Sequence, residues 1–328
     1  TLMNLGYMVY TVSLQSKSLK NIEDTLSKLN QTIQKTKKRQ IGVQEINIID
    51  IAKPITKFSK MIIDANSINF YLEKAYSIAK SGRPGPVFLD IPADIQNTMI
   101  DEKKVSKDKY KAPKENFNID SKLDLVIKKL KNSKRPLIHL GHGVKLSEAQ
   151  KLVKIFFNKF KIPFVVTWNA DDIINTNHKM YCGRPGAFGE RGSNFIVQNC
   201  DFYLSLGTRL PYMVTGYNAK KFAAKAKFKV MVDIDPNELN KTDLKIDLKI
   251  KSDAKFFLKK LFDKLKKYNF SNEWLDYCQS IRKKYPILLK KMIDEKTYVN
   301  SYYFVKTLSR YTKKYDSIIT DMGFSFTT

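Results

Sequence analysis

Apolar residues along the chain fall into short runs that alternate with stretches of helical periodicity. Five apolar runs predict strands: 87–91 (VFLDI), 135–143, 162–167, 200–207 and 228–235. Three amphipathic stretches predict helices: 68–82, 147–160 and 253–267. Because strands that alternate with helices are typical of α/β proteins, the pattern predicts doubly wound parallel sheets, with a central Rossmann-like domain.

Local signals set the expected ends and faces of these helices. Gly82 is expected to end the first helix as its C′ residue, and Ser147 and Asp253 are expected to cap the other two. The apolar face of the first helix is predicted to consist of Phe70, Leu72, Ala75, Tyr76, Ile78 and Ala79.

The same pattern divides the chain into four regions. Residues 1–96 alternate strands and helices, and residues 97–119 are polar and charged, as is typical of a linker. Residues 120–268 repeat a strand–turn–helix unit and predict a second domain. Residues 269–328 are helical and rich in Lys and Tyr, and a further strand is expected to begin at 315.

The charge balance raises the question of a nucleic-acid partner. The chain has 59 Lys and Arg against 32 Asp and Glu, a net charge of +27. Only eight of the basic residues are Arg, and the Lys residues are spread through every segment instead of forming one stripe. Solvated lysines are therefore the favoured interpretation over a specific nucleic-acid surface, which stays open as an alternative.

The lengths of the apolar runs and the spacing of the cysteines indicate in which cellular compartment the protein is expected. No apolar run approaches the roughly 18 residues of a membrane span, so no membrane association is expected. Cys182, Cys200 and Cys278 are far apart in sequence, which argues against a disulfide framework or a cysteine-based zinc site. Both features favour a cytoplasmic protein.

The segment 81–96, SGRPGPVFLDIPADIQ, combines residues that stiffen and loosen the backbone. Pro84 and Pro86 fix φ, whereas Gly82 and Gly85 permit conformations closed to other residues. The result is a rigid entry to a strand with Arg83 in the turn. A structural loop with a solvated arginine is the alternative.

Polar residues and glycines gather at the predicted strand ends of the middle region. In a parallel sheet, ligands bind beyond the carboxyl ends of strands, where backbone N–H groups and helix N-termini are exposed. The residues there are suited to a dinucleotide, although the Gly-x-Gly-x-x-Gly fingerprint is missing. The plainer alternatives are that Gly141 and Gly143 only turn the chain, that His142 is a surface residue, and that Asp171 and Asp172 begin a helix. No Ser/His/Asp grouping or HExxH motif supports a hydrolase.

Several segments resemble the thiamine-diphosphate enzymes of the acetolactate synthase (acetohydroxyacid synthase) type. They are RQIGVQEINIIDIAKPITKFSK (39–60), AKSGRPGPVFLDIPADIQ (79–96), GHG (141–143), CGRPGAFGERGS (182–193), LSLGTRLPYMVTG (204–216) and VMVDIDPNELNK (230–241). The resemblance implies that 1–96 ends a pyrimidine-binding domain and that 120–268 is a central domain of the kind that binds FAD. It implies that 269–328 leads into a domain that binds the diphosphate through Mg²⁺.

The resemblance also implies roles for individual residues. Gln44 and Lys57 match positions at the edge of the active site, and Arg83 would contact FAD from the first domain. The remaining residues matching cofactor-binding positions are Gly141, His142, Gly143, Thr167, Trp168, Asn169, Gly183, Gly189, Glu190, Arg191, Gly207, Arg209, Asp233, Ile234, Asp235 and Asp253. The glutamate that acts on the thiamine pyrimidine and the GDGS motif that holds Mg²⁺ would lie outside residues 1–328, so this fragment by itself is expected to be inactive.

The implied activity is carboligation in branched-chain amino acid biosynthesis. A 2-keto acid such as pyruvate is decarboxylated and joined to a second carbonyl, in a homodimer or tetramer. One departure matters: the family's Phe-Asp-Asp-Arg-Val is replaced by LPYMV (210–214), which makes FAD optional. That departure favours, as an alternative, a divergent member that acts in sugar or cell-surface biosynthesis. A non-catalytic nucleotide-binding module is a further alternative.

Overall fold

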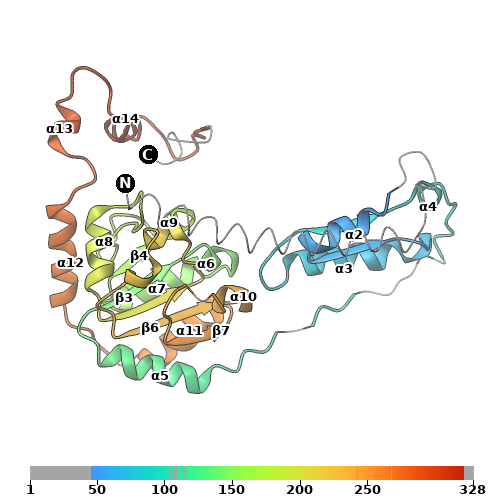
Figure 1. The fold of residues 1–328 in the computed structure, drawn as a ribbon, viewed down its shortest axis with the longest axis horizontal. Helices are drawn as coiled ribbons and strands as arrows, with labels where there is room; N and C mark the ends of the chain where they lie inside the picture. Colours follow the sequence, from blue (N-terminus) through green and yellow to red (C-terminus); the bar gives the residue numbers. More distant parts are fainter. Residues whose placement is uncertain are drawn as a thin grey trace, which may run out of the picture. The chain divides into compact units, whose positions relative to one another are not determined.

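The computed structural model describes residues 46–103, 105, 110–113, 115–241, 243–266 and 268–320. The chain divides into two compact units, Thr1–Ala112 and Pro113–Thr328 (Figure 1). Gln44 and the rest of 39–45 lie outside the described residues.

The smaller unit is built around two parallel strands. Its described elements are α2 (Ile48–Ala52), η1 (Lys53–Ile55), β1 (Phe58–Met61), η2 (Ala65–Ser67), α3 (Ile68–Lys80), β2 (Val87–Asp90) and α4 (Ala93–Gln96). β1 and β2 pair in parallel, with Phe58 opposite Val87. Both strands are only partly buried, so the expectation that the VFLDI run is buried on both faces is wrong.

Helix α3 ends where the sequence predicts, and its predicted apolar face is partly covered. It ends at Lys80, and Gly82 follows at C′ with φ +53°, the left-handed conformation expected of a glycine there. The predicted apolar face is only partly covered: Ala75 is buried and Phe70, Ile78 and Ala79 are half-buried, whereas Leu72 and Tyr76 are exposed. Two strands offer too narrow a surface to cover a 13-residue helix.

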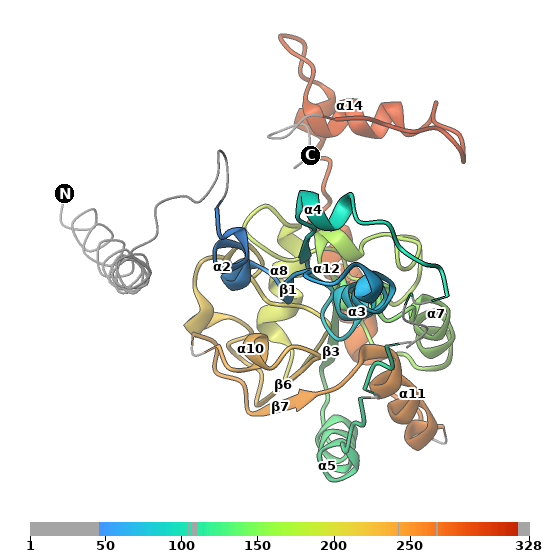
Figure 2. The same cartoon turned by 90° about the vertical axis from the view of Figure 1, so that its right-hand side faces the viewer.

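The larger unit contains a five-stranded parallel sheet in the order β4-β3-β5-β6-β7 (Figures 1 and 2). The strands are β3 (Pro136–Leu140), β4 (Phe164–Val166), β5 (Phe202–Leu206), β6 (Phe228–Asp233) and β7 (Leu248–Lys251). The main helices are α5 (Asp120–Lys131), α7 (Gln150–Lys159), α8 (Arg191–Asn199), α11 (Ala254–Leu265) and α12 (Glu273–Lys284). The shorter ones are α6 (Gly143–Leu146), η3 (Trp168–Ala170), α9 (Tyr212–Thr215), η4 (Ala219–Lys221), α10 (Pro236–Leu239), α13 (Lys290–Ile293) and α14 (Ser301–Leu308).

Helices cover both faces of this sheet. One apolar cluster joins α5, α7 and α11 to residues such as Ile138 and Leu204. The other joins α8 and α12 to Leu137 and Tyr203, which point to the opposite face because side chains alternate along a strand. The prediction of a doubly wound parallel α/β sheet is therefore confirmed.

Two caps and two strands test the local predictions. Asp253 caps α11 as expected, because its Oδ1 accepts a hydrogen bond from the Phe256 N–H at 2.9 Å. Ser147 is not an N-cap: it ends α6, and α7 begins at Gln150. Strand β7 was not predicted. Residues 315–320 form no strand. No described strand lies beside them to accept and donate backbone hydrogen bonds, so their backbone groups bond to water instead.

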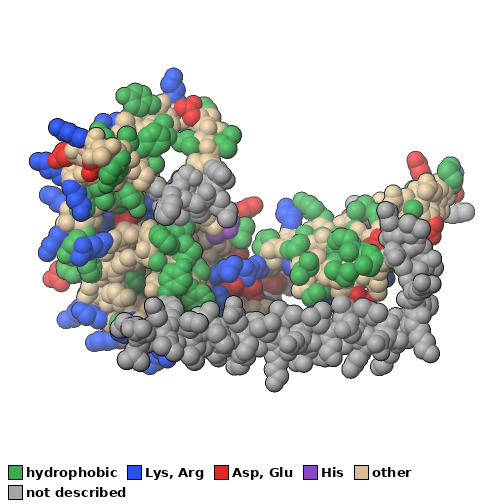
Figure 3. Space-filling model, turned by 45° about the horizontal axis from the view of Figure 1, so that its top comes forward, with side chains coloured by type: hydrophobic (Ala, Val, Ile, Leu, Met, Phe, Trp, Pro, Cys, Tyr) green, Lys and Arg blue, Asp and Glu red, His purple; other side chains and the backbone are tan. Residues whose placement is uncertain are grey.

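The three cysteines are buried and free, and all three belong to the α8–α12 cluster. Burial raises the pKa of the Cys200 thiol to about 12, so it stays protonated at neutral pH. In the described ranges no helix is both long and apolar enough to span a bilayer. On the face seen in Figure 3, Lys and Arg side chains are interspersed with apolar and acidic ones.

Candidate functional site

The strand order creates a crevice at the carboxyl edge of the large sheet. The chain runs from β3 outward to β4 and then returns to β5 on the other side of β3, so the connections after β3 and β5 leave in opposite directions. Ligands in open α/β sheets bind at such a reversal point. We call the residues at the carboxyl ends of β3, β5 and β6 the rim: 141–143, 207–209 and 233–235.

Glycines allow two rim loops to touch. The Gly143 N–H donates to the Gly207 carbonyl at 2.9 Å, and Gly207 has φ +62°. A Cβ on Gly141 would lie 2.2 Å from the Gly207 carbonyl oxygen. These glycines thus have a packing role, because a side chain at any of these positions would collide with the facing loop.

His142 joins this rim to the end of β4. The side chain is exposed, and its Nδ1 lies 3.0 Å from the Asn169 carbonyl oxygen, where Nδ1 must be the donor. The Thr167 N–H donates to the Leu140 carbonyl at 3.0 Å. The structure therefore brings together the predicted residues 141–143 and 167–169.

Asp171 and Asp172 do not begin a helix; they follow η3. Asp171 accepts a hydrogen bond from the Tyr181 hydroxyl at 2.8 Å. Asp172 pairs with Lys145 at 2.8 Å, and this hydrogen bond lowers the pKa of the Asp172 carboxyl.

Arg209 is held at the rim by a buried acid. Its Nε lies 3.1 Å from Oε1 of Glu238, a side chain that is 8% exposed, and Lys241 pairs with the same carboxylate. The side chain of Arg209 is 58% exposed. The buried carboxylate therefore positions an accessible guanidinium beside Gly207.

The predicted carboxylates have local backbone partners. Asp233 accepts a hydrogen bond from the Asp235 N–H at 3.0 Å, and Asp235 caps α10 by accepting one from the Asn237 N–H at 2.9 Å. Asp253 caps α11. Asp233 and Asp235 belong to the rim, with Ile234 between them, whereas Asp253 serves as a helix cap.

The loop 182–193 closes on itself. The Arg184 N–H donates to the Glu190 carboxylate at 3.1 Å, and the Glu190 N–H donates to the Arg184 carbonyl at 2.7 Å. A Cβ on Gly189 would lie 2.4 Å from that carbonyl, and one on Gly183 would lie 2.2 Å from Oε2 of Glu190. Burial raises the pKa of the Glu190 carboxyl.

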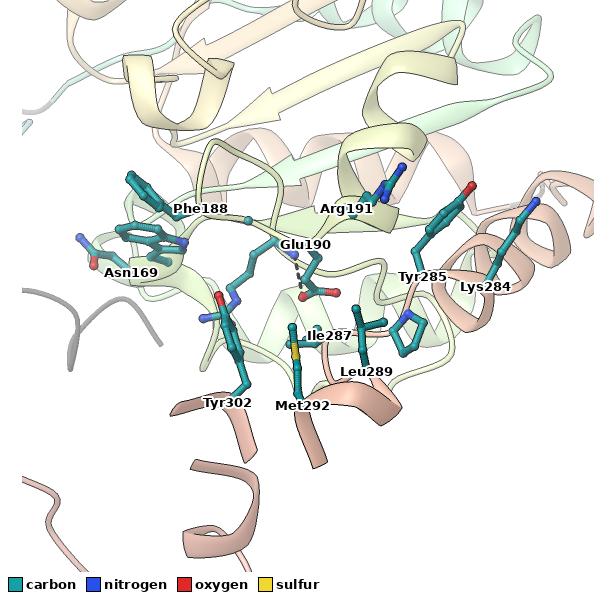
Figure 4. Close-up of a pocket in the computed structure, with 14 residues that line it drawn as sticks. Asn169, Phe188, Glu190, Arg191, Lys284, Tyr285, Ile287, Leu289, Met292 and Tyr302 are labelled. Carbon is teal, nitrogen blue, oxygen red and sulfur yellow. Dashed lines mark hydrogen bonds between the residues drawn. The ribbon is translucent and has the colours of Figure 1, made fainter. Parts of the chain in front are cut away.

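A pocket of about 380 Å³ opens between this loop and the segment 284–302 (Figure 4). It is lined by Trp168, Asn169, Arg184, Phe188, Gly189, Glu190, Arg191, Lys284, Tyr285, Pro286, Ile287, Leu289, Met292 and Tyr302. Five of these residues carry predicted roles: Trp168, Asn169, Gly189, Glu190 and Arg191. The rim residues are absent from the lining, so most of the predicted cofactor residues of the larger unit fall into two groups, and Thr167, Gly183 and Asp253 belong to neither.

Lys57 and Arg83 belong to the smaller unit. The Lys57 ammonium donates to the carbonyls of Ile78 and Ser81, each at 2.5 Å, and so satisfies the C-terminal end of α3. A Cβ on Gly85 would lie 3.1 Å from the Lys57 Cδ. Arg83 is exposed in the turn before β2, and its predicted contact with a central-domain ligand stays a prediction.

Sequence reasoning did not single out several residues that shape these sites. Glu238 anchors Arg209, Arg184 pairs with Asp171 at 3.6 Å, and Tyr285 lines the pocket. The one local signal that could have identified any of them is the position of Glu238, an acid within a few residues of the end of a strand.

Comparison with known proteins gives three further findings. Residues 123–261 match the family described as "Thiamine pyrophosphate enzyme, central domain". The chain is 30% identical over 250 residues to the acetolactate synthase large subunit of Corynebacterium glutamicum, covering 74% of this chain and 39% of that protein. It is 32% identical over 259 residues to that of Cyanidium caldarium (74% and 43%).

A third relative is the probable acetolactate synthase large subunit of Methanocaldococcus jannaschii. It is 31% identical over 294 residues, which cover 85% of this chain and 48% of the relative. The chain thus spans less than half the length of each of these three relatives.

Proposed function

We propose that the chain is part of a thiamine diphosphate-dependent 2-keto acid decarboxylase and carboligase resembling acetolactate synthase, because residues 123–261 match the central domain of thiamine pyrophosphate enzymes. Thiamine diphosphate supplies the electron sink that makes decarboxylation of the keto acid possible. In this proposal 1–96 completes a pyrimidine-binding domain, 97–119 is a linker, and 269–328 leads into a Mg²⁺-diphosphate-binding domain. A second copy of the chain, in a homodimer or tetramer, is part of the proposal.

The central domain 120–268 is proposed to hold a nucleotide, FAD foremost, across the rim. The observation that carries this proposal is the contact between the loops of Gly143 and Gly207 at the strand-order reversal, with Arg209 fixed beside them. An exposed and positioned guanidinium suits an anionic diphosphate. In the family likeness, Asp233, Asp235 and Asp253 lie toward the adenine and ribose.

The segment that departs from the family pattern contributes little charge here. Leu210 is 4% exposed, Pro211 caps α9, and the Tyr212 hydroxyl donates to Asp243. No carboxylate or arginine of 210–214 reaches the rim, because the segment contains none. Arg209 is therefore the basic residue on which rim binding of a diphosphate is proposed to depend.

FAD titration of the chain tests this part of the proposal. We expect saturable binding, followed by flavin fluorescence, that Arg209→Ala weakens about tenfold or more, the scale of a charge-assisted contact. Arg310→Ala removes the same charge outside the rim and should leave the affinity unchanged. Absence of FAD binding, or equal losses in both variants, would contradict the nucleotide assignment.

The catalytic part needs the protein that contains this chain together with thiamine diphosphate and Mg²⁺. We expect two pyruvate molecules to be converted to acetolactate and CO₂, with activity lost when either cofactor is omitted. Gln44→Ala and Lys57→Ala are expected to lower kcat, and Lys57→Arg should retain more activity than Lys57→Ala. Pyruvate consumption without carboligation product would refute the acetolactate assignment.

A further inference from the structure

The amino-terminal edge of the large sheet lies at the opposite end of the strands from the rim and is rich in basic residues. Arg135, Asp201 and Lys227 directly precede β3, β5 and β6. The Asp201 N–H donates to the Arg135 carbonyl at 3.0 Å, and the Lys227 N–H donates to the Asp201 carbonyl at 2.8 Å, so these residues lie side by side. We call the cations that gather here the basic edge: Lys129, Lys134, Arg135, Lys225, Lys227, Lys229 and Lys245.

Two carboxylates lie on the same edge, and both are bound by backbone N–H groups. Asp201 accepts hydrogen bonds from the Lys134 and Arg135 N–H groups at 3.0 and 2.8 Å. Asp247 accepts one from the Lys229 N–H at 2.8 Å. Among the residues that the structure describes, no carboxylate forms an ion pair with a side chain of the basic edge. The two acids therefore hold the loops in place and leave the basic side chains for a partner.

The lysines of a neighbouring surface are arranged differently. Lys260 and Lys264 of α11 pair with Asp120 and Asp124 of α5 at 2.7 and 2.5 Å. The basic edge has more charge than its own surroundings offset. The C-terminal ends of α5 and α8 lie there, and each carries about half a negative charge. Together with the two acids, the helix ends offset about three of the seven positive charges, and the remainder attracts an anionic partner.

Hydrogen bonds to neutral groups fix several of these cations. The Arg135 Nε donates to the Asn199 carbonyl at 2.7 Å, and the Lys225 ammonium donates to the Asn199 side-chain oxygen at 2.7 Å. The Lys229 ammonium donates to the Phe222 carbonyl at 2.8 Å. Because these acceptors are uncharged, the cations are positioned without being neutralised, and less side-chain entropy is lost when a ligand binds.

The length of the basic edge favours an extended polyanion. The edge runs from β3 through β5 and β6 to β7, and three steps between neighbouring strands make about 14 Å. That row is longer than one phosphate group and accommodates several in succession. A flexible single strand follows a twisted sheet edge more easily than a duplex, whose persistence length is about 150 base pairs. We propose that the basic edge binds the phosphate backbone of single-stranded nucleic acid without reading its sequence.

Fluorescence anisotropy of a fluorescein-labelled uridylate dodecamer, titrated with the chain, tests this proposal. We expect saturable binding whose logarithmic salt slope is about −3, because about four phosphates are neutralised and each contributes about −0.7 on a single strand. The affinity should therefore fall roughly fiftyfold between about 50 and 200 mM salt. Lys134→Gln combined with Lys225→Gln and Lys227→Gln should make the slope shallower by about two. All three side chains are exposed, so folding should survive.

A matched variant separates the basic edge from the net charge of the whole chain. Lys151, Lys154 and Lys159 are exposed on α7, and replacing all three by Gln removes the same charge at another surface. That variant should keep the salt slope and the affinity of the original chain. Equal losses in the two triple variants, or absence of dodecamer binding, would overturn the proposal.

Two competitors identify the chemistry that the basic edge recognises. Inorganic phosphate should displace the dodecamer no better than chloride at equal ionic strength, because one phosphate engages only part of the row. Selective displacement by phosphate would instead indicate a site for a single anion. A glutamate dodecamer should compete more weakly than unlabelled uridylate, and stronger competition by the peptide would assign the edge to an acidic protein. Either of these results would rule out the nucleic-acid assignment.

Discussion

The two units of this chain use the same strand–helix chemistry and differ in how much apolar surface they bury. In the larger unit helices cover both faces of five strands, and residues such as Ile138 and Leu204 are fully buried. In the smaller unit, the buried apolar residues among those described are Ala52, Ile62, Ala65 and Ala75. A parallel sheet needs both faces covered, so strand pairing without that cover leaves a weak core.

Hydrogen exchange should show the largest difference between the units. Amides of β5 are expected to exchange at least about a thousandfold more slowly than those of β1, because local opening follows buried apolar contacts. Amide exchange monitored by mass spectrometry on peptides from each strand measures this ratio. Similar protection in β1 and β5 would break the comparison.

The next largest effect is expected from truncating a buried side chain in the core of the larger unit. Phe156 is fully buried between α7 and the sheet, so Phe156→Ala should lower the free energy of unfolding by about 3–5 kcal/mol. Trp168 and Trp274 both lie in the larger unit, so urea titration followed by tryptophan fluorescence reports on that unit. Tyr76→Ala in α3 should change stability by less than about 0.5 kcal/mol, and a larger loss there would reveal an unrecognised core.

His139 makes the larger unit sensitive to acid. Burial lowers its pKa to about 3 from 6.5, and its Nδ1 shares a hydrogen bond of 2.6 Å with the Tyr203 hydroxyl. The unfolded chain therefore binds a proton that the folded chain excludes, and stability falls as the pH drops below 6.5. From pH 7 to pH 5 the expected loss is roughly 2 kcal/mol.

The control for this acid sensitivity removes both partners of the buried hydrogen bond. His139→Leu with Tyr203→Phe should flatten the pH dependence of the urea midpoint over the same interval. An unchanged slope in the double variant would assign the acid sensitivity to other groups.

The smallest expected effect concerns the cap of α11. Asp253→Ala should cost about 1 kcal/mol, and Asp253→Asn should retain most of that stability because an amide oxygen also accepts the Phe256 N–H. If Asp253 also contacts a nucleotide ribose, Asp253→Ala should weaken FAD binding as well. A stability loss without any change in FAD affinity would confine Asp253 to capping.

Several features could be predicted from the sequence because their causes are local. The apolar runs of β3 to β6 predicted buried parallel strands, and Gly82 and Asp253 marked helix ends. Ser147 was misassigned because α6 ends on it: its hydroxyl donates to the Val144 carbonyl at 3.1 Å, and Glu148 takes φ +54°. An N-cap signal in sequence cannot tell whether the preceding turn has already used that side chain.

By itself, the sequence determined the fold class and the loops that follow each strand, because periodicity and turn residues act over a few neighbours. Only the tertiary structure decided that Glu238 holds Arg209 and that the pocket joins loop 182–193 to residue 302. Glu238 and Arg209 meet because β5 and β6 are paired, and the pocket residues, more than a hundred positions apart, meet because α12 packs against α8. The tertiary structure also decided how much of α3 is buried, because that burial depends on how many strands lie beneath the helix.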